Sequence, residues 1–467
     1  MATDSAGPGS ELLQEAVLAG LPTAIAQLSS LVRIPSVSWD GYDPTAVAAS
    51  AEAIAELARG TGVFDTVEVL RAPMQSTDEL GHPAVLATRA ARAGRPTVML
   101  YAHHDVQPQG DDALWESPPF EPTLRGDRLY GRGTSDDKAG VTAHLAAIRA
   151  LSEVLGDELQ VGIVLFIEGE EEFGSRSFPS FLEQQRDRLA ADVIVVADSD
   201  NWSTTTPSVT VSLRGAVAFN LTVSTLDHAQ HSGMFGGAAP DAMLAAIKLL
   251  ATLWHEDGSV AVEGLTTFDG IVPPEFPADR FREESGILPG VSPIGSGGNL
   301  YGQMWFGPSI TVTGIDAPSV RDASNTLSPT VRVRVSARIA PGQTAADGLA
   351  ALERHLQAKI PLGAHIAIAD VDPGEPFLVD TSGWAFSEAK AALSAGWGDD
   401  PVEAGIGGSI PFISDLVRVF PEAQILVTGV EDPDTRAHSP NESQHLGVLR
   451  RAILSEALLL HRLNARS

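Results

Sequence analysis

The sequence contains no cysteine. This absence excludes disulfide bonds, a thiolate nucleophile, thiolate-bound zinc and cysteine-held iron–sulfur clusters. It also fits a reducing compartment, and we expect the protein in the cytoplasm. No apolar run approaches the roughly 18 residues that a membrane-spanning helix needs. The first eleven residues have neither the basic patch nor the apolar core of a signal peptide, so we expect no membrane partner.

Positive charge is scarce: 31 Lys and Arg face 60 Asp and Glu, which gives a net charge of −29. Binding to nucleic acid or to an anionic membrane requires clustered Lys and Arg, so we expect neither partner. Hydrophobic residues make up 43% of the 467 residues, which is enough to bury real cores. A chain of this length predicts two or three domains.

Four short runs rich in Val, Ile and Leu are typical of strands that are buried on both faces of a parallel sheet. Helical patterns lie between these runs, over 141–155 and 175–189. Such alternation of strands and helices predicts an α/β domain with a mixed, mostly parallel sheet. The four expected strands cover residues 97–101, 161–167, 193–197 and 424–430.

The middle of the chain follows a different pattern, β-α-β-β-α-β, which is typical of a ferredoxin-like α+β domain. We therefore predict a first domain in two parts, 1–213 and 376–467, interrupted by an inserted domain at 214–375. The Gly- and Pro-rich segment 291–307 is expected to be a long loop inside the insertion. The six elements expected there are strand 217–223, helix 241–254, strands 309–313 and 331–339, helix 345–358 and strand 365–371.

Acidic and imidazole side chains follow the four expected parallel strands, and a fifth cluster opens the helix near residue 139. Ligands bind at the carboxyl ends of the strands in an open parallel sheet, so we expect the clusters to converge. They are His103-His104-Asp105, Glu168 with Glu170–Glu172, Asp198 with Asp200, Glu431–Asp434 with His438, and Asp136-Asp137.

Imidazole and carboxylate ligands without a thiolate suit Zn²⁺ or Mn²⁺. A pair of such ions activates a shared water when one carboxylate bridges them and another stays free to take the proton. Glu171 and Glu172 are adjacent and can divide the roles of base and ligand. Competing chemistries lack their motifs: the sequence has no P-loop, no Gly-x-Ser-x-Gly elbow and no His-Glu-x-x-His.

Several motifs together resemble the aminoacylase/carnosinase-type di-metal peptidases, and the cytosolic non-specific dipeptidases in particular. The resemblance extends from about residue 100 to 442. It is carried by YAHHDVQP at 101–108, YGRGTSDDK at 130–138, EGEEEFGS at 168–175, SDNW at 199–202, HSG at 231–233, GSIP at 408–411 and AHSPNE at 437–442.

The resemblance implies a role for each motif residue. One divalent ion would be held by His103 and Asp200, and the other by Glu172 and His438. Asp136 would bridge the two ions, and the peptide bond that follows it would be cis. Two alternatives stay open, because His104 adjoins His103 and Asp198 competes with Asp200. Of the remaining motif residues, Asp105 would orient the His103 ring and Glu171 would be the general base.

The same resemblance makes the inserted domain a lid and a dimerisation domain. His231 would reach the partner subunit's site and stabilise the oxyanion. Arg338 would bind the C-terminal carboxylate of the substrate through its guanidinium fork. Thr326 and Ser409 match further positions that contact substrate.

The implied function is metal-dependent hydrolysis of dipeptides or very short peptides with a free C-terminus. A metal-bridged water would attack the peptide bond, with two divalent ions in each subunit of a homodimer. Zn²⁺ is the first expectation for the metal, and Mn²⁺ is the alternative. An N-acyl-amino-acid amidohydrolase or a carboxypeptidase would use the same site. A metal-binding protein without catalysis would lack the base or a ligand, and this sequence has both.

Overall fold

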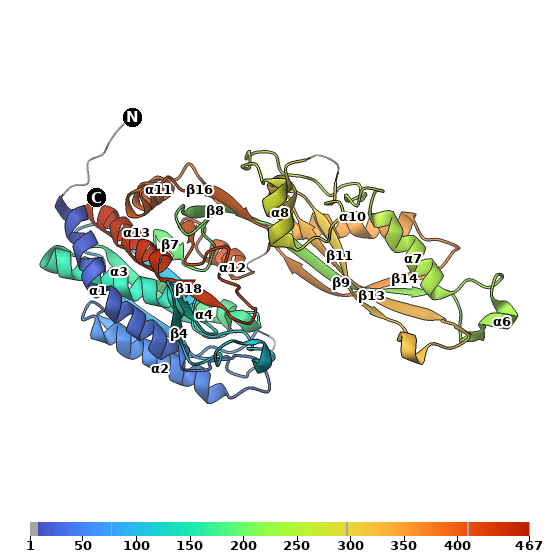
Figure 1. Cartoon of the computed structure of the whole chain (residues 1–467), viewed down its shortest axis with the longest axis horizontal. Coiled ribbons are helices and arrows are strands. Elements are labelled where there is room, and N and C mark those ends of the chain that lie inside the picture. The colour runs from blue at the N-terminus through green and yellow to red at the C-terminus, as the bar shows by residue number, and fades with distance from the viewer. Residues whose placement is uncertain (1–7, 76, 296–297, 409–410, 467) are drawn as a thin grey trace. The chain divides into compact units, whose positions relative to one another are not determined.

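The computed structural model describes residues 8–75, 77–295, 298–408 and 411–466. These residues form two compact units, which are described separately (Figure 1). The first unit takes its residues from Met1–Val211, Val379–Ala404 and Asp415–Ser467. The second takes Ser212–Leu378 and also Gly405–Ser414, a segment that lies within the expected range 376–467.

The larger sheet has nine strands in the order β1-β2-β6-β3-β7-β17-β8-β15, with β16 beside β8. Its centre consists of four neighbouring strands that run parallel. The sequence predicted these four buried strands, and the structure confirms them. They are β6 (Gly162–Glu168), β3 (Thr97–His103), β7 (Val193–Val196) and β17 (Gln424–Thr428).

Antiparallel strands flank this parallel centre and make the sheet mixed. They are β1 (Thr66–Leu70), β2 (Ala84–Arg89), β8 (Ser208–Leu213) and β15 (Phe377–Leu378). Strand β16 (Val402–Ile406) pairs with β8. A separate three-stranded sheet has the order β18-β5-β4 and contains β4 (Thr123–Arg125), β5 (Arg128–Tyr130) and β18 (Ser443–His445).

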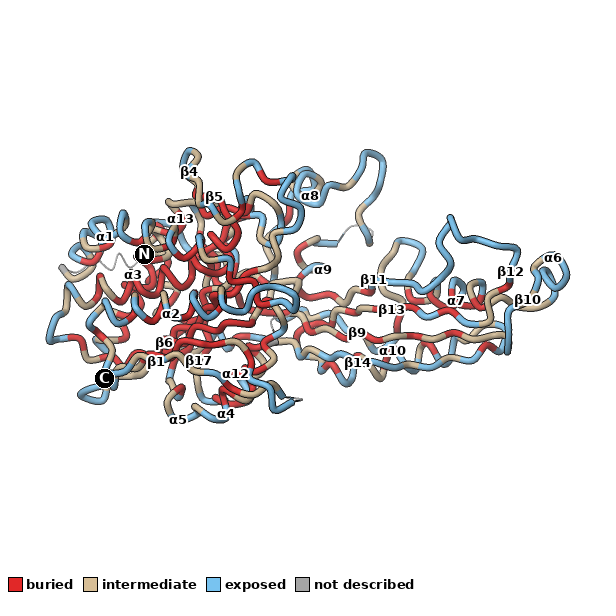
Figure 2. The backbone as a smooth tube through the Cα atoms, turned by 90° about the horizontal axis from the view of Figure 1, so that it is seen from below, coloured by how far each residue is buried: buried red, intermediate tan, exposed pale blue. Residues whose placement is uncertain are grey.

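Helices of the first unit form a layer in which α1, α3, α13 and α11 pack against one another, with α3 on β3 and α11 on β17. Figure 2 shows the buried backbone concentrated in α3, α13 and the strands beside them. The bounds are α1 (Pro8–Val32), α2 (Pro44–Gly60), α3 (Lys138–Leu155), α11 (Trp384–Trp397) and α13 (Leu446–Ala465). Helix α12 (Pro411–Val419) contains residues of both units.

The single helix expected over 175–189 is two helices, α4 (Phe178–Gln184) and α5 (Arg186–Leu189). Gln185 separates them because its backbone angles, φ −109° and ψ 15°, are not helical. The apolar spacing continues through this break, so the sequence pattern alone did not reveal it.

Helix α1 contradicts the expectation that no segment is long and apolar enough to span a membrane. By length and composition only, Gly9–Val32 is long and apolar enough to do so. Leu13, Leu28 and Leu31 of this helix are nevertheless buried, and α1 packs on α3 and α13. A core helix and an N-terminal signal sequence both pass this test of length and composition, and 28% of the apolar window is buried.

The second unit contains an antiparallel sheet in the order β11-β13-β9-β14, with α7 and α10 packed on it. Residues along β9 alternate between buried and half-buried, which places Val217, Phe219 and Leu221 in the core. The expected β-α-β-β-α-β order is confirmed. Its elements are β9 (Gly215–Ser224), α7 (Ala242–Leu250), β11 (Ser309–Asp316), β13 (Thr330–Ile339), α10 (Ala345–Ala358) and β14 (His365–Gly374).

The segment 291–307 is not a loop throughout, because it ends in helix α9 (Leu300–Phe306). Asn299 begins this helix by accepting a hydrogen bond from the backbone N–H of Gly302. The remaining short elements of the second unit are β10 (Gln230–His231), α6 (Ser232–Phe235), α8 (Ala278–Ser285) and β12 (Thr326–Leu327).

Candidate metal centre

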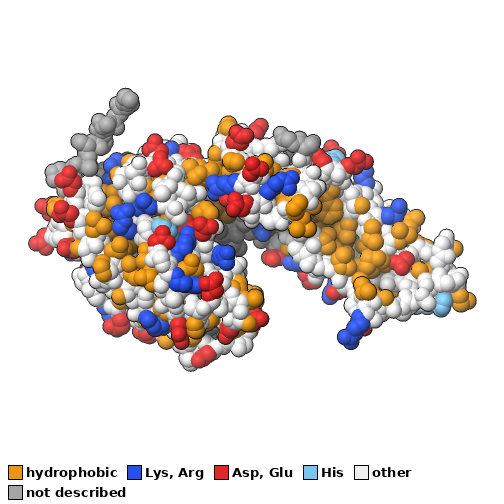
Figure 3. Space-filling view, viewed as in Figure 1, with side chains coloured by type: hydrophobic (Ala, Val, Ile, Leu, Met, Phe, Trp, Pro, Cys, Tyr) orange, Lys and Arg blue, Asp and Glu red, His pale blue; other side chains and the backbone are white. Residues whose placement is uncertain are grey.

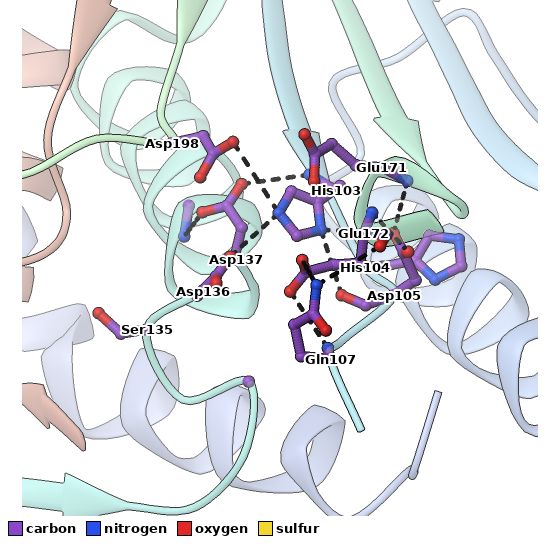
Figure 4. Close-up of polar contacts among 12 residues, drawn as sticks. His103, His104, Asp105, Gln107, Ser135, Asp136, Asp137, Glu171, Glu172 and Asp198 are labelled. Carbon is purple, nitrogen blue, oxygen red and sulfur yellow. Dashed lines mark hydrogen bonds and ion pairs between the residues drawn. The ribbon is translucent and has the colours of Figure 1, made fainter. Parts of the chain in front are cut away.

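Several of the expected metal-ligand side chains lie at the carboxyl ends of the parallel strands. His103 is the last residue of β3, and Asp198 follows the end of the neighbouring strand β7. Asp136 and Asp137 lie directly before α3. Figure 4 shows these side chains converging with Glu171 and Glu172, so residues from four of the five clusters expected at the sheet edge lie together.

Asp136 lies between the two histidines of this cluster. Its Oδ1 is 3.2 Å from His103 Nε2, and its Oδ2 is 3.0 Å from His438 Nε2. Glu172 Oε2 lies 3.3 Å from the same nitrogen of His438. Each oxygen of Asp136 thus faces a different imidazole, which is the arrangement of a carboxylate that bridges two ions. The Asp136–Asp137 peptide bond is cis, as the resemblance implies.

Two groups of side chains could each hold an ion: His103 with Asp137 and Asp198, and Asp136 with Glu172 and His438. His103 Nε2 is buried and makes no hydrogen bond, although it faces Asp136 and lies 3.9 Å from Asp198 Oδ2. A buried nitrogen aimed at carboxylates in this way fits a metal ligand. The donor set, imidazole nitrogen and carboxylate oxygen without sulfur, suits Zn²⁺ or Mn²⁺.

Asp137, a member of the first group, accepts hydrogen bonds from backbone N–H groups. Its Oδ2 accepts a hydrogen bond of 3.1 Å from the backbone N–H of His103, and its Oδ1 accepts one of 3.1 Å from Gly140. Both oxygens therefore bind backbone donors, and the residue caps the N-terminus of α3. This leaves Asp198 as the carboxylate of that group that is available to an ion.

Burial and mutual repulsion shift the pKa values of the carboxyl groups. Burial and the neighbouring Asp136 charge raise the pKa of Glu172 to about 7. Burial raises the pKa of Asp198 to about 6 against the opposing effect of His103. Burial alone would raise the pKa of Asp136, but the two imidazoles outweigh it and hold that pKa below its usual value. A cation would relieve the repulsion among these groups.

The positive partner on the outer side of the centre is His438, whose side chain is 58% exposed. Its contacts with the Asp136 and Glu172 carboxylates raise the pKa of His438 to about 10. In the metal-free protein its imidazole therefore carries a proton at neutral pH.

Asp105 is buried and contacts both His103 and the turn that carries the two glutamates. Its Oδ1 lies 3.3 Å from His103 Nδ1, and its Oδ2 accepts a 2.7 Å hydrogen bond from Ser38 Oγ. It also accepts hydrogen bonds from the backbone N–H groups of Glu171 (3.1 Å) and Glu172 (3.0 Å). One carboxylate thus links the His103 ring to the 3₁₀ turn Glu171–Phe173.

Glu171, the expected general base, lies beside the candidate metal ligands. Figure 4 shows its carboxylate on the same side of His103 as Asp198. Burial raises the pKa of Glu171 well above its ordinary value, while the nearby His103 lowers it. A carboxylate with a raised pKa is a more effective acceptor of a proton from water.

The structure separates Asp198 from Asp200. Strand β7 ends at Val196, and Asp198 turns toward His103 directly afterwards. Asp200 is exposed, and its backbone forms a bridge with Glu431. Among the described residues, the group around His103 contains Asp198 and not Asp200. The geometry therefore favours Asp198, the alternative that the sequence left open, over Asp200.

The ambiguity between His103 and His104 is also resolved by geometry. The His104 ring is buried, and its Nε2 lies 2.9 Å from the backbone oxygen of Pro83, apart from the ligand groups. Burial lowers the pKa of His104 to about 4. His104 is a packed, neutral imidazole.

The residues expected to contact substrate belong to the second unit. His231 and Thr326 are register partners across β10 and β12, so the fold brings these two together. Arg338 lies in β13 opposite Ser309 of β11. Ser409 lies outside the described residues. The roles of these four residues stay predictions.

Gln107 is a residue of the centre to which the sequence analysis assigned no role. Its backbone N–H donates to Glu172 Oε1 (3.1 Å), and its side-chain Nε2 donates to Glu172 Oε2 (2.7 Å). Both oxygens of this expected ligand are therefore oriented by one residue. The sequence did indicate Gln107, because it lies in the motif at 101–108. The sequence does not show that Gln107 contacts Glu172, which is 65 residues away.

Comparison with known proteins assigns the chain to a family. The sequence model of "Peptidase family M20/M25/M40" matches residues 99–462. The chain belongs to this family. Its expected ligands and base all lie within the matched region.

Relatives and solved structures extend this result. The chain is 33% identical over 368 residues to a cysteinylglycine-S-conjugate dipeptidase of Corynebacterium striatum, covering 78% of this chain and 80% of the relative. It is 26% identical over 448 residues to the Cys-Gly metallodipeptidase DUG1 of Saccharomyces cerevisiae, covering 90% and 91%.

Two solved structures show the same fold. The yeast dipeptidase Dug1p has a TM-score of 0.79 at 21% identity, covering 98% of each chain. Human carnosine dipeptidase 1 has a TM-score of 0.77 at 22% identity, covering 97% of this chain and 98% of that one.

We expect divalent-ion binding to strengthen as the pH rises from about 6 to about 8. Glu172 and His438 hold protons in the metal-free protein, and a binding ion must displace them. Each displaced proton makes the apparent affinity rise about tenfold per pH unit below the pKa. Titration calorimetry in two buffers of different ionisation enthalpy measures the number of protons released when an ion binds. A pH-independent affinity without proton release would contradict this reading.

We expect Asp198→Asn to weaken ion binding by more than the roughly tenfold to hundredfold typical of residues that only support a ligand. Asp200→Asn, two residues away, serves as the matched control and should bind ions like the wild type. Equilibrium titration with Zn²⁺ and Mn²⁺ separates the two variants. A strong loss of ion affinity in Asp200→Asn alone would show that Asp200, and not Asp198, is the ligand.

Proposed function

We propose that the protein hydrolyses the peptide bond of dipeptides or very short peptides with a free C-terminus, using two divalent ions in each subunit. The observation that carries this proposal is Asp136, whose two carboxylate oxygens face two different imidazoles. Membership of a peptidase family supports it, as do relatives named as a dipeptidase and as a metallodipeptidase.

In this proposal His103 and Asp198 would hold one ion, Glu172 and His438 would hold the other, and Asp136 would contribute to both sites. Zn²⁺ is the first candidate and Mn²⁺ the second, because both accept imidazole and carboxylate ligands. When bound, such ions polarise the scissile carbonyl and lower the pKa of the attacking water.

The protein's own groups then move the proton. Glu171 takes it from the attacking water and gives it to the leaving amine, which completes hydrolysis without a change in the enzyme. Asp105 keeps the Glu171 backbone in place and faces Nδ1 of His103. This contact leaves Nε2 of His103 directed at Asp136 and Asp198.

Substrate recognition is assigned to the second unit on the basis of the family resemblance. Arg338 binds the C-terminal carboxylate, because a guanidinium fork matches a carboxylate with two parallel hydrogen bonds. His231 stabilises the oxyanion in the partner subunit's site. Thr326, the register partner of His231, and Ser409 add further substrate contacts.

We propose that the protein is a homodimer that forms through the inserted domain. Residues 214–375 would be the lid and dimerisation domain, and residues 1–213 and 376–467 would form the catalytic domain. β14 is an edge strand of its sheet, and Leu244 and Ile247 on α7 are 48% and 58% exposed. Figure 3 shows hydrophobic side chains gathered over this part of the second unit. A cytoplasmic location, without nucleic-acid or membrane partners, fits the acidic, cysteine-free sequence.

The substrate class is tested with metal-stripped protein to which Zn²⁺ or Mn²⁺ is returned. Cys-Gly, its S-conjugates and β-Ala-His form the dipeptide arm of the panel, and N-acetyl amino acids form the other arm. Activity that disappears on stripping and returns on dipeptides would support the proposal. Return on N-acetyl amino acids alone would identify an amidohydrolase instead.

We expect Glu171→Gln to lower kcat on dipeptides by about 10²–10⁴-fold, because the amide cannot accept the water's proton. Ion binding should stay close to that of the wild type, since the variant keeps all the proposed ligands. Steady-state kinetics at saturating metal, together with a metal titration, measures both quantities.

Glu121→Gln, a change on an exposed loop at the start of the three-stranded sheet, is the control and should keep full activity. The proposed mechanism fails if Glu171→Gln turns over dipeptides at the wild-type rate with its ions bound.

A further inference from the structure

Glu442 belongs to the motif at 437–442, and the function proposed above gives it no role. Its side chain is fully buried, and it ends the loop that carries His438. The Glu442 carboxylate accepts four hydrogen bonds, two at each oxygen. The donors are Arg132 Nη1 (2.6 Å) and the N–H of Gly133 (3.0 Å) at Oε2, and the N–H groups of Ser135 (3.0 Å) and Asp136 (3.2 Å) at Oε1.

All four donors lie on one loop, which runs from the end of β5 to the start of α3 and ends in the aspartates of the centre. The loop requires glycine at Gly133, where φ is +79° and an added Cβ would lie 2.5 Å from Val106 Cγ1. Three backbone N–H groups of this loop point at a single carboxylate. The loop that delivers Asp136 is therefore shaped around Glu442.

The His438 loop is fixed at the same place. His438 and Asn441 both have positive φ, +61° and +64°. Asn441 holds the base of the loop, because its Nδ2 donates to the backbone oxygen of Leu114 (3.0 Å) and its Oδ1 accepts from the N–H of Glu116 (2.9 Å). Glu442 follows directly, so His438 lies four residues from the carboxylate that organises the Asp136 loop.

A neutral side chain cannot replace this carboxylate without loss. All four groups that hydrogen-bond to the Glu442 carboxylate are donors, and one of them is the Arg132 guanidinium, which forms a buried ion pair with it. A glutamine of the same size would place an N–H₂ group against backbone N–H groups or the guanidinium. Some of the four buried donors would then have no acceptor.

We propose that Glu442 is a positioning residue that holds the Asp136 loop against the His438 loop, so that the two side chains can share one divalent ion. This inference rests on the metal-dependent function proposed above. It gives Glu442 a role toward the metal that goes beyond stabilising the fold, and that difference can be measured.

Glu456 provides the matched control. It is a buried carboxylate on α13 that accepts a 2.8 Å hydrogen bond from His144 Nδ1 on α3. This pair joins two helices and lies on neither ligand loop. His144 also contacts the backbone oxygen of Tyr101 in β3 through Nε2 (2.9 Å), but neither partner contacts a proposed ligand side chain. Glu456→Gln therefore reports the effect of losing a buried charged contact away from the two ligand loops.

The experiment compares Glu442→Gln, Glu456→Gln and the wild type by calorimetric titration with Zn²⁺ and Mn²⁺ and by thermal unfolding in a chelator. We expect Glu442→Gln to weaken ion binding about tenfold to a hundredfold, as loss of a group that supports a ligand does. Glu456→Gln should lower the metal-free Tm but bind ions like the wild type.

Unchanged affinity in Glu442→Gln, with or without a lower Tm, would overturn the inference while leaving the proposed function intact. A wild type that bound no divalent ion would overturn both. If Glu442→Gln does not fold, Arg132→Lys replaces it. That variant keeps the charge but loses the guanidinium geometry, and weaker ion binding is expected; unchanged binding would overturn the inference.

Discussion

The first unit is organised around one contact, in which the two oxygens of the buried Asp136 carboxylate face the imidazoles of His103 and His438. Glu172 and Asp198 add further negative charge at the same place, and burial raises the pKa of both. A buried cluster of like charges is unfavourable unless a cation compensates it. The arrangement is therefore best explained by divalent ions, and the catalytic proposal follows from their chemistry.

The groups around this contact are held mostly by the protein backbone. Asp105 accepts hydrogen bonds from the N–H groups of Glu171 and Glu172, and Glu442 accepts hydrogen bonds from three N–H groups of the Asp136 loop. Gln107 orients both oxygens of Glu172. Each of these residues touches a ligand or its loop; Asp105 and Gln107 come from the segment after β3, and Glu442 comes from the loop before β18. Precise placement of the ligands thus depends on tertiary contacts between distant parts of the chain.

Much of this arrangement could be predicted from the sequence. The four buried strands are continuous apolar runs, and the inserted α+β domain follows from the order of its elements. The choice between Asp198 and Asp200 could not, because it depends on where β7 ends, and a motif match does not fix that point to the residue. The break at Gln185 and helix α9 were missed because local backbone geometry, rather than apolar spacing, determines them. The partners of Gln107 and Glu442 lie far away in the sequence, so only the fold reveals them.

The most direct test of the account is the number of divalent ions bound by each chain, measured by elemental analysis and by anomalous diffraction from crystals grown with Zn²⁺ or Mn²⁺. The account predicts two ions per wild-type chain, about 3.5–4 Å apart on either side of Asp136, and the loss of this pair in Asp136→Asn. A single ion per chain, or a pair that persists in Asp136→Asn, would contradict it.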